Sequence, residues 1–219
     1  MRTIFSLSCV MILGLLGASQ AKASISYCDL QVGNLVTNCG FETGALSPWT
    51  VSGNTTNPPG GFDGSEYGSD SFDADTGSFG FYAGPLGSSL VLSQTLALLA
   101  STTYDISFEL EQDTLNTAPA TYTHSFSATF NGGSLVSLTN PAVAGSFVLY
   151  SYAVTTGASI VSPSISFSFR NDDNYWSFDD VVVVPQSSTP EPASLVLVGS
   201  SVAMLGLFIS RKRRKGFTF

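Results

Sequence analysis

Two glutamates in the middle of the chain have the spacing of a carboxylate pair. Glu109 and Glu111 fall on the same side of an alternating segment, Thr103-Tyr104-Asp105-Ile106-Ser107-Phe108-Glu109-Leu110-Glu111. At the rise of a β-strand they would lie about 7 Å apart, which is compatible with paired-carboxylate glycoside hydrolysis. Two acids on one solvated strand are also common. A glycan-processing hydrolase is therefore an alternative to a protein without catalytic activity.

Other residues that could carry chemistry give weaker indications. His124, the single histidine, shares a predicted strand face with aromatic side chains, which indicates a structural, partly buried imidazole. Asp73 and Asp75 are spaced as in calcium loops, but the further acidic residue of an EF-hand is missing, so a solvated acidic loop is the alternative. The run Asn171-Asp172-Asp173-Asn174 predicts a hairpin turn. The sequence has no phosphate-binding glycine loop, thiolate metal cluster or nucleophile elbow.

Strands must position these residues. Tyr104, Ile106, Phe108 and Leu110 alternate with polar residues, which is typical of a half-buried strand. Similar patterns predict strands at 34–37, 49–51, 78–83, 88–96, 122–130, 134–138, 147–154, 164–169 and 175–184, with a hairpin turn at 131–133. The acidic, glycine-rich stretch 52–89 reads mainly as a long loop. Because no segment here has a helical period, residues 24–184 are predicted to form one all-β domain, an antiparallel β-sandwich of the jelly-roll kind.

Charge is distributed unevenly along the chain. The formal net charge is -8, but seven of the eight basic residues lie near the two ends. From Ser24 to Thr189 there are 15 acids and one base, Arg170, which gives a net charge of -14. Such a body lacks the cations that binding to a nucleic-acid backbone requires. A hydrophobic content of 43% argues against a disordered chain.

The first 23 residues have the parts of a secretory signal peptide. A basic start precedes a short apolar run and the pattern Ala21-Lys22-Ala23, which predicts cleavage by signal peptidase between Ala23 and Ser24. The alternative is a retained membrane anchor, for which the run is short. Export to an oxidising compartment favours a disulfide between the two remaining cysteines, Cys28 and Cys39, over two buried thiols.

The C-terminus has three parts in order. A linker, 185–192, ends in Pro190-Glu191-Pro192, and an apolar stretch follows at 193–209. As a helix this stretch would be about 25 Å long, just enough to cross a bilayer core. The tail, 210–219, contains Arg211-Lys212-Arg213-Arg214-Lys215, which is expected on the cytoplasmic side. This arrangement predicts a single transmembrane helix with the acidic body outside.

These three parts resemble the PEP-CTERM sorting signal of Gram-negative bacteria. In that family the tail is recognised by an exosortase, a membrane protease-transpeptidase, in bacteria that typically make exopolysaccharide. The resemblance implies transient anchoring in the inner membrane, cleavage near Pro190-Glu191-Pro192 and transfer of the body to the cell envelope or the outside. The same tail ends some proteins described as ice-binding, but it specifies a destination rather than an activity.

Two edges of the body carry a second resemblance. The opening Asn38-Cys39-Gly40-Phe41-Glu42-Thr43-Gly44, with Pro48-Trp49, and the closing Phe178-Asp179-Asp180-Val181 look like carbohydrate-binding modules and related galactose-binding-like jelly rolls. In such domains the opening Glu and a closing-strand Asp often share a structural calcium. The resemblance thus implies calcium ligands at Glu42 and Asp179, with Asp180 as the substitute. Alternatively, Glu42 caps a turn and the two aspartates end a strand.

Sugar binding needs exposed aromatic faces beside amides or carboxylates. The candidates are Tyr67, Phe72, Tyr175 and Trp176, with Tyr150 and Tyr152 as further ones, whereas Trp49 is assigned to the core. The sequence therefore predicts an exported, non-enzymatic protein of the cell envelope or extracellular matrix, associated with exopolysaccharide through carbohydrate binding or as a structural component. Besides the hydrolase, an adhesin or other surface-binding protein, including an ice-binding one, is an alternative. The acidic body favours neutral sugars or cation-bridged polymers as ligands.

Overall fold

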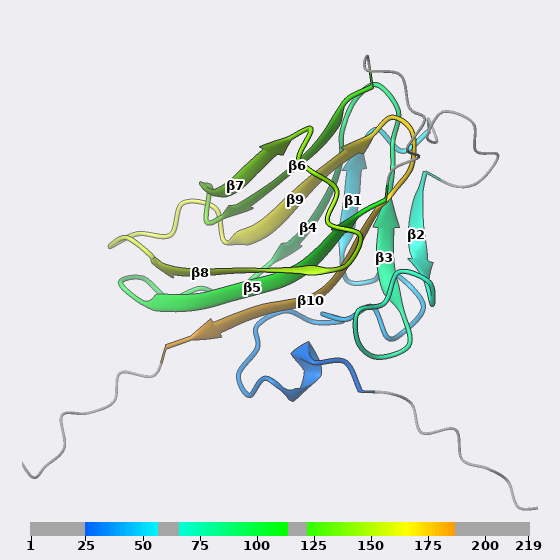
Figure 1. Cartoon of the computed structure of the whole chain (residues 1–219). Coiled ribbons are helices and arrows are strands. Elements are labelled where there is room, and N and C mark those ends of the chain that lie inside the picture. Colours follow the sequence, from blue (N-terminus) through cyan, green and yellow to red (C-terminus); the bar gives the residue numbers. More distant parts are fainter. Residues whose placement is uncertain (1–24, 57–65, 114–121, 187–219) are drawn as a thin grey trace, which may run out of the picture.

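The computed structural model describes residues 25–56, 66–113 and 122–186 (Figure 1). The predicted signal peptide with its cleavage site at Ala23–Ser24, the Pro-Glu-Pro motif, the apolar stretch 193–209 and the basic tail all lie outside the described residues. Within the described ranges, no helix combines the length and the apolar character needed to span a membrane.

The described residues form two five-stranded antiparallel sheets that pack face to face (Figure 1). Sheet A has the order β1-β4-β9-β6-β7, with bounds Thr50–Gly53, Leu90–Thr95, Ser164–Asn171, His124–Phe130 and Gly133–Thr139. Sheet B has the order β2-β3-β10-β5-β8, with bounds Tyr67–Asp70, Gly80–Ala83, Trp176–Pro185, Thr103–Gln112 and Val148–Thr155. This confirms the predicted β-sandwich. Only β2–β3 and β6–β7 are consecutive strands in one sheet, and the repeated crossing between sheets agrees with the jelly-roll prediction.

Alternation in the strands builds the core between the sheets. In β5 the four predicted inward residues, from Tyr104 to Leu110, are buried, and the same period of two buries Phe167 and Phe169 on β9. The rings of Phe167 and Phe178 meet across the sandwich with centroids 4.5 Å apart. Burying large aromatic side chains from both inner faces is a major source of stability in a sandwich.

The predicted strand at 34–37 was wrong. Asn34 instead lies beside β10, where its side-chain Nδ2 donates to the carbonyl of Val181 (3.1 Å) and its Oδ1 accepts from the N–H of Val183 (2.9 Å). An asparagine side chain here replaces a strand partner, so no ladder forms.

Two further predictions about loops need correction. In the stretch 52–89 the predicted strand at 78–83 is confirmed as β3, but a strand that was not predicted, β2 at Tyr67–Asp70, pairs with it despite its glycine and acidic residues. The segment 171–174 is not a hairpin turn, since it connects β9 of sheet A to β10 of sheet B. By contrast, the turn at Asn131-Gly132 is confirmed, and both residues have positive φ.

The N-terminal segment starts with a single 3₁₀ turn, Cys28–Leu30, that packs against β10. The expected disulfide joins Cys28 to Cys39 with the two sulfurs 1.98 Å apart. This bond ties residues 25–31 to the loop that precedes β1.

We expect Phe178→Ala to lower the free energy of unfolding by about 3–5 kcal/mol, because it removes a fully buried ring at the centre of the aromatic core. Phe72→Ala is the matched control, and it should change stability by less than about 0.5 kcal/mol because that ring is exposed. Urea unfolding of the two variants measures both values. Equal losses in both variants would contradict the packing described.

Candidate functional site

The outer face of sheet B carries most of the acids expected to do chemistry. Glu109 and Glu111 point away from the core on β5, as the alternation predicts. In the strand register Glu109 lies opposite Asp179 of β10, and Glu111 lies opposite Ser177. Residues opposite each other in a ladder share a face, so these four polar side chains form a patch on the solvent side of the sheet.

A loop formed by residues 71–79 folds back over this patch. It connects β2 to β3, and the hydroxyl of Ser177 donates to Asp73 Oδ1. A Cβ at Gly80 would overlap the backbone oxygen of Asp73. Glycine is therefore required at the start of β3 for the loop to lie directly on the strand.

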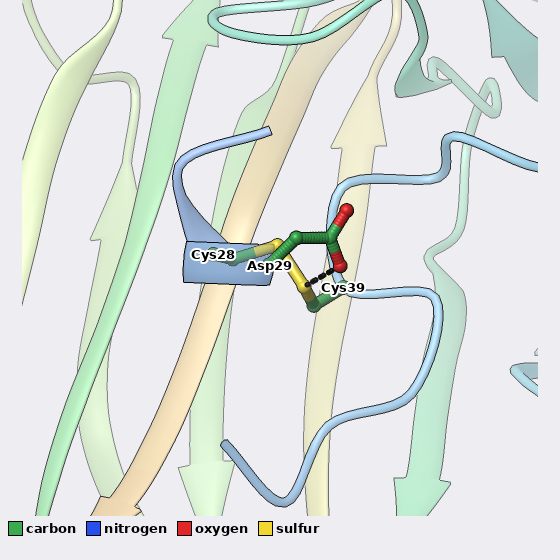
Figure 2. Close-up of side chains that lie close together, drawn as sticks. All are labelled: Cys28, Asp29 and Cys39. Atoms are coloured by element: carbon green, nitrogen blue, oxygen red, sulfur yellow. Dashed lines mark hydrogen bonds between the residues drawn. A yellow bond between two sulfur atoms is a disulfide. The ribbon is translucent and has the colours of Figure 1, made fainter. Parts of the chain in front are cut away.

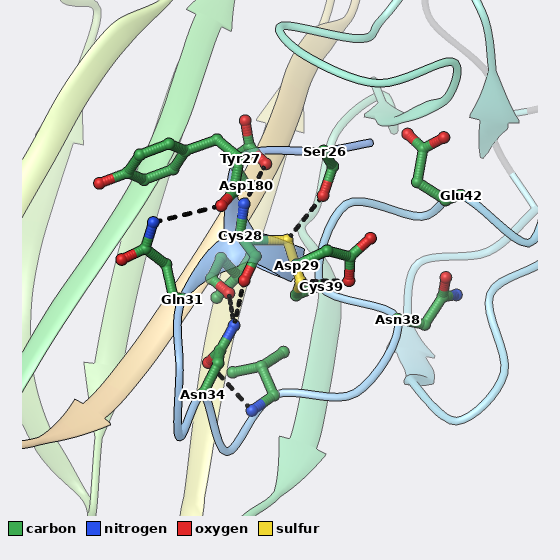
Figure 3. The surroundings of a disulfide bond; sticks show 12 residues. Ser26, Tyr27, Cys28, Asp29, Gln31, Asn34, Asn38, Cys39, Glu42 and Asp180 are labelled. Carbon is green, nitrogen blue, oxygen red and sulfur yellow. Dashed lines mark hydrogen bonds between the residues drawn. A yellow bond between two sulfur atoms is a disulfide. The ribbon is translucent and has the colours of Figure 1, made fainter. Parts of the chain in front are cut away.

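The two predicted calcium ligands on β10 hold this loop. Asp179 Oδ2 accepts from the N–H groups of Asp75 (2.9 Å) and Thr76 (3.2 Å). Asp180 Oδ2 accepts from the Thr76 hydroxyl (2.5 Å), and its Oδ1 accepts from the N–H of Cys28 (3.0 Å). Asp180 has a positive φ of 53° at the bulge in β10, which turns its side chain toward the N-terminal segment (Figure 3).

Glu42 binds the same loop at its other end. Its carboxylate accepts from the N–H of Ser78 (2.8 and 3.0 Å) and of Phe79 (3.2 Å). In Figure 3 this carboxylate lies apart from that of Asp180, on the other side of the disulfide. The structure thus brings Asp179 and Glu42 onto two parts of one loop, the N–H groups of residues 75–76 and of residues 78–79, whereas Asp180 is directed to Cys28 and Thr76.

One group of potential metal ligands among the described residues is Cys28, Asp29 and Cys39 (Figure 2). The two sulfurs are bonded to each other, and Cys39 Sγ is 3.5 Å from Asp29 Oδ1. A metal needs a thiolate, not a disulfide sulfur. This group is therefore a covalent link and not a metal centre.

Burial and mutual repulsion raise the pKa values of the acids on this face. Burial, followed by the charge of Asp180, raises the pKa of Asp179 to about 8. Burial also raises the pKa of Asp73 to about 7, with help from Asp70, and that of Glu109 to about 7, with help from Asp75. The pKa values of Asp75, Glu111 and Asp113 are raised too, again mainly by burial. These acids are not paired with a basic side chain, because Arg170, the only Lys or Arg among the described residues, binds Asp172.

A cleft of about 310 Å³ lies beside the acidic patch on the same face. Val182 and Val184 of β10 form an apolar part of its lining, and Tyr27 and Gln31 reach it from the N-terminal segment. In Figure 3 these two side chains lie on the side of the disulfide opposite Glu42. The remaining lining comes from Asp105, Ile106, Ser107 and Ser151. The cleft thus combines a half-exposed aromatic ring with a carboxylate, hydroxyls and an amide.

The predicted sugar-binding aromatics do not gather at this cleft. The prediction for Trp176 was wrong, because its ring is 1% exposed in the core and its Nε1 donates to the Arg170 carbonyl (2.9 Å).

The other predicted aromatic residues are not part of the cleft either. Tyr67, Tyr150 and Tyr152 face inward and pack against the core. Tyr175 packs edge-on against Tyr82, with centroids 5.3 Å apart. Phe72 is 93% exposed on the loop, and Trp49 is in the core as expected.

Two outward-facing tyrosines were not predicted from the sequence: Tyr27, which lines the cleft, and Tyr82, whose ring packs against Tyr175. Tyr82 alternates with the buried Phe81 and Ala83, so the period of β3 would have placed it on the outer face. Tyr27 has no such local signal, since it comes before the first strand and reaches sheet B through the disulfide and a hydrogen bond from its N–H to Thr76 Oγ1 (2.7 Å).

No protein-family model and no curated protein sequence matches this chain. Among solved structures, it is similar to the enzymatically active domain of tailspike protein 4 from bacteriophage CBA120, at 17% identity over 70% of this chain with a TM-score of 0.51. The match spans about a fifth (21%) of the tailspike chain. A cyclase from Fischerella sp. TAU, bound to 4-(1H-indol-3-yl)butan-2-one, matches at 14% identity over 71% of this chain and 98% of its own, with a TM-score of 0.50. The module TmCBM61, in complex with β-1,4-galactotriose, matches at 19% identity over 70% and 99% of the two chains, with a TM-score of 0.46. Likeness at these identities shows the fold alone.

The raised pKa values predict that stability falls as the pH rises. Asp179, Asp73 and Glu109 bind protons more tightly in the folded chain, so their contribution is full below about pH 4 and is lost as the pH rises through about 7 to 8. We expect the melting temperature, measured with a chelator present, to fall on the order of 5 °C between about pH 5 and pH 8.

Asp179→Asn should flatten this fall, because the amide keeps an oxygen for the loop N–H groups but carries no charge. Asp29→Asn, which changes an exposed acid, is the matched control and should leave the slope as it is. A slope that is the same in all three proteins would show that these buried acids do not set the pH dependence.

Proposed function

We propose that this chain is an exported, non-enzymatic glycan-binding protein of the cell envelope or extracellular matrix, sorted by its C-terminal tail. The observation that carries the proposal is the cleft on sheet B, where the ring of Tyr27 stands beside Gln31 and Asp105. A sugar ring packs its C–H face on an aromatic side chain and directs its hydroxyls to carboxylates and amides. The volume of about 310 Å³ is at the lower end of small-molecule sites.

Charge selects among the glycans that this cleft would take. The body carries a net charge of -14 between Ser24 and Thr189, and the cleft itself includes Asp105. An anionic polymer would be repelled unless divalent cations bridged it. Neutral oligosaccharides, or neutral stretches of an exopolysaccharide, are therefore the proposed ligands.

Sorting rests on the sequence alone. The signal peptide, the Pro-Glu-Pro motif, the apolar stretch and the basic tail support export by signal peptidase, transient anchoring in the inner membrane and processing by an exosortase. The confirmed disulfide is consistent with folding outside the reducing cytoplasm.

Calcium is proposed at Glu42 and Asp179, with Asp180 as the substitute for Asp179. The donor chemistry fits, because calcium prefers carboxylate and carbonyl oxygens and Asp179 is a fully buried carboxylate with its pKa raised to about 8. Both carboxylates now accept N–H groups of loop 71–79, so calcium binding would exchange some of these contacts. Bound calcium would neutralise the two acids and fix the loop.

Hydrolysis is the second candidate, and Glu109 is the residue that favours it. Burial and the neighbouring charge of Asp75 raise its pKa to about 7, which is the range of a general acid. Glu111 lies on the same outer face, two residues along β5. Reducing sugar released by the wild type, and not by Glu109→Gln, would favour the hydrolase over the binding protein.

We expect Tyr27→Ala to weaken binding of neutral oligosaccharides by about tenfold or more, because an aromatic contact is worth on the order of 1–2 kcal/mol. Isothermal titration with β-1,4-linked galacto-, gluco- and xylo-oligosaccharides measures this. The backbone N–H of Tyr27 remains to bind Thr76, so the segment should stay in place.

Phe72→Ala is the control for Tyr27→Ala, because it removes an exposed ring outside the cleft. It should leave the affinity unchanged. If Phe72→Ala abolished binding and Tyr27→Ala did not, the ligand would lie on loop 71–79 and the cleft would be excluded.

Calcium should raise the melting temperature of the wild type by several degrees near neutral pH, since a ligand that binds only the folded state stabilises it. Glu42→Gln should lose most of this shift. Asp105→Asn changes an acid of the cleft, so it should keep the shift. The calcium site is ruled out if chelation and calcium addition leave the wild-type melting curve unchanged.

A further inference from the structure

The connection between β9 and β10 contains a buried carboxylate without a hydrogen-bond donor. Asp173 is 1% exposed, and neither Oδ1 nor Oδ2 receives a hydrogen bond from any residue in the described ranges. An ionised carboxylate removed from water requires a positive charge or donors close to it. Asp173 therefore indicates a missing cationic partner.

The neighbouring basic side chain is already used. Arg170 donates to both oxygens of Asp172 (2.8 and 2.7 Å). Asp172 also accepts from the N–H groups of Gly87 (2.9 Å) and Thr123 (3.0 Å). Asp172 is thus saturated, and no other Lys or Arg is present among the described residues to neutralise Asp173.

The side chain near Asp173 that can carry a positive charge is His124. Its Nδ1 lies 3.3 Å from Asp173 Oδ1 and 2.7 Å from Asn171 Oδ1. A proton on Nδ1 would be directed to the closer amide oxygen, so even a charged imidazole leaves the carboxylate without a hydrogen bond. An ion pair with His124 alone does not satisfy Asp173.

The strand ladder fixes the position of two of these groups. His124 and Asn171 are paired residues on β6 and β9, and the turn after Asn171 brings Asp173 to the same place. The Asn171 Nδ2 donates to the carbonyls of Asp113 and Tyr175 (both 2.9 Å). These bonds hold the amide so that its Oδ1 faces His124, and the same oxygen also accepts from the N–H groups of Asn174 (3.2 Å) and Asp173 (3.4 Å).

We propose that Asp173, Asn171 and His124 bind a divalent metal ion that accepts one imidazole nitrogen together with oxygen ligands, such as Mn²⁺ or Zn²⁺. The distances of 2.7 and 3.3 Å between Nδ1 and the two oxygens suit atoms that share one ion. The neutral imidazole gives its Nδ1 lone pair to the metal, and the carboxylate supplies the negative charge. Imidazole suits transition metals better than calcium. The metal selectivity of this site should therefore differ from that of the calcium site proposed at Glu42 and Asp179.

The test is a titration of the full chain with Mn²⁺ after removal of metals, with calcium kept in excess. Isothermal titration and the electron paramagnetic resonance signal of free Mn²⁺ report the binding. We expect one ion per chain, and Asp173→Asn should weaken its binding at least tenfold. Glu42→Gln is the matched control, because it changes the proposed calcium site and should bind Mn²⁺ like the wild type.

Folding of the variant is checked in the presence of a chelator. Asp173→Asn should then melt at the same temperature as the wild type or higher, because the unpaired buried charge is gone. Zn²⁺ should raise the melting temperature of the wild type and not that of Asp173→Asn. The proposal is overturned if the wild type binds neither ion, or if Asp173→Asn binds them with unchanged affinity.

Discussion

Two adjacent aspartates on one buried strand determine how the outer face of sheet B is covered. Asp179 and Asp180 accept N–H and hydroxyl groups from loop 71–79 and from Cys28, two segments that lie far from β10 and from each other in the sequence. The bulge in β10 makes this arrangement possible, because it turns two consecutive side chains to different partners. The loop, the N-terminal segment and the cleft between that segment and the sheet all depend on these contacts.

The same interactions explain why the face is acidic and still ordered. Backbone N–H groups stabilise the charged form of Asp179, while burial and Asp180 oppose it, and opposition is the stronger effect. Glu109 on the neighbouring strand responds to the same charges. This face has an excess of negative charge that no basic side chain of the described residues balances. The same excess is the reason for the proposed calcium ion and for the expected pH dependence of stability.

The strands could be predicted because their alternation is local. Tyr104 to Leu110 show the period of two, and Asn131-Gly132 marks the turn, so β5 to β7 follow from the sequence. Trp176 was predicted to be exposed. The alternating sequence Trp176-Ser177-Phe178-Asp179 could have placed it on the same face as the buried Phe178. Residues 34–37 and the cleft were beyond such reasoning, because a side chain of Asn34 pairs with β10 and Tyr27 reaches sheet B from outside the strands.

The disulfide has a consequence for when the cleft exists. Tyr27 and Gln31 flank the short turn that contains Cys28, and the bond to Cys39 is the covalent tie between this segment and the sandwich. Without the disulfide, the hydrogen bonds of the N–H groups of Tyr27 and Cys28 and the burial of Cys28 would keep the aromatic side of the cleft against sheet B. If the cleft binds a glycan as proposed, reduction of the disulfide would loosen one of its walls, and the proposed recognition would then depend on the redox state of the surroundings.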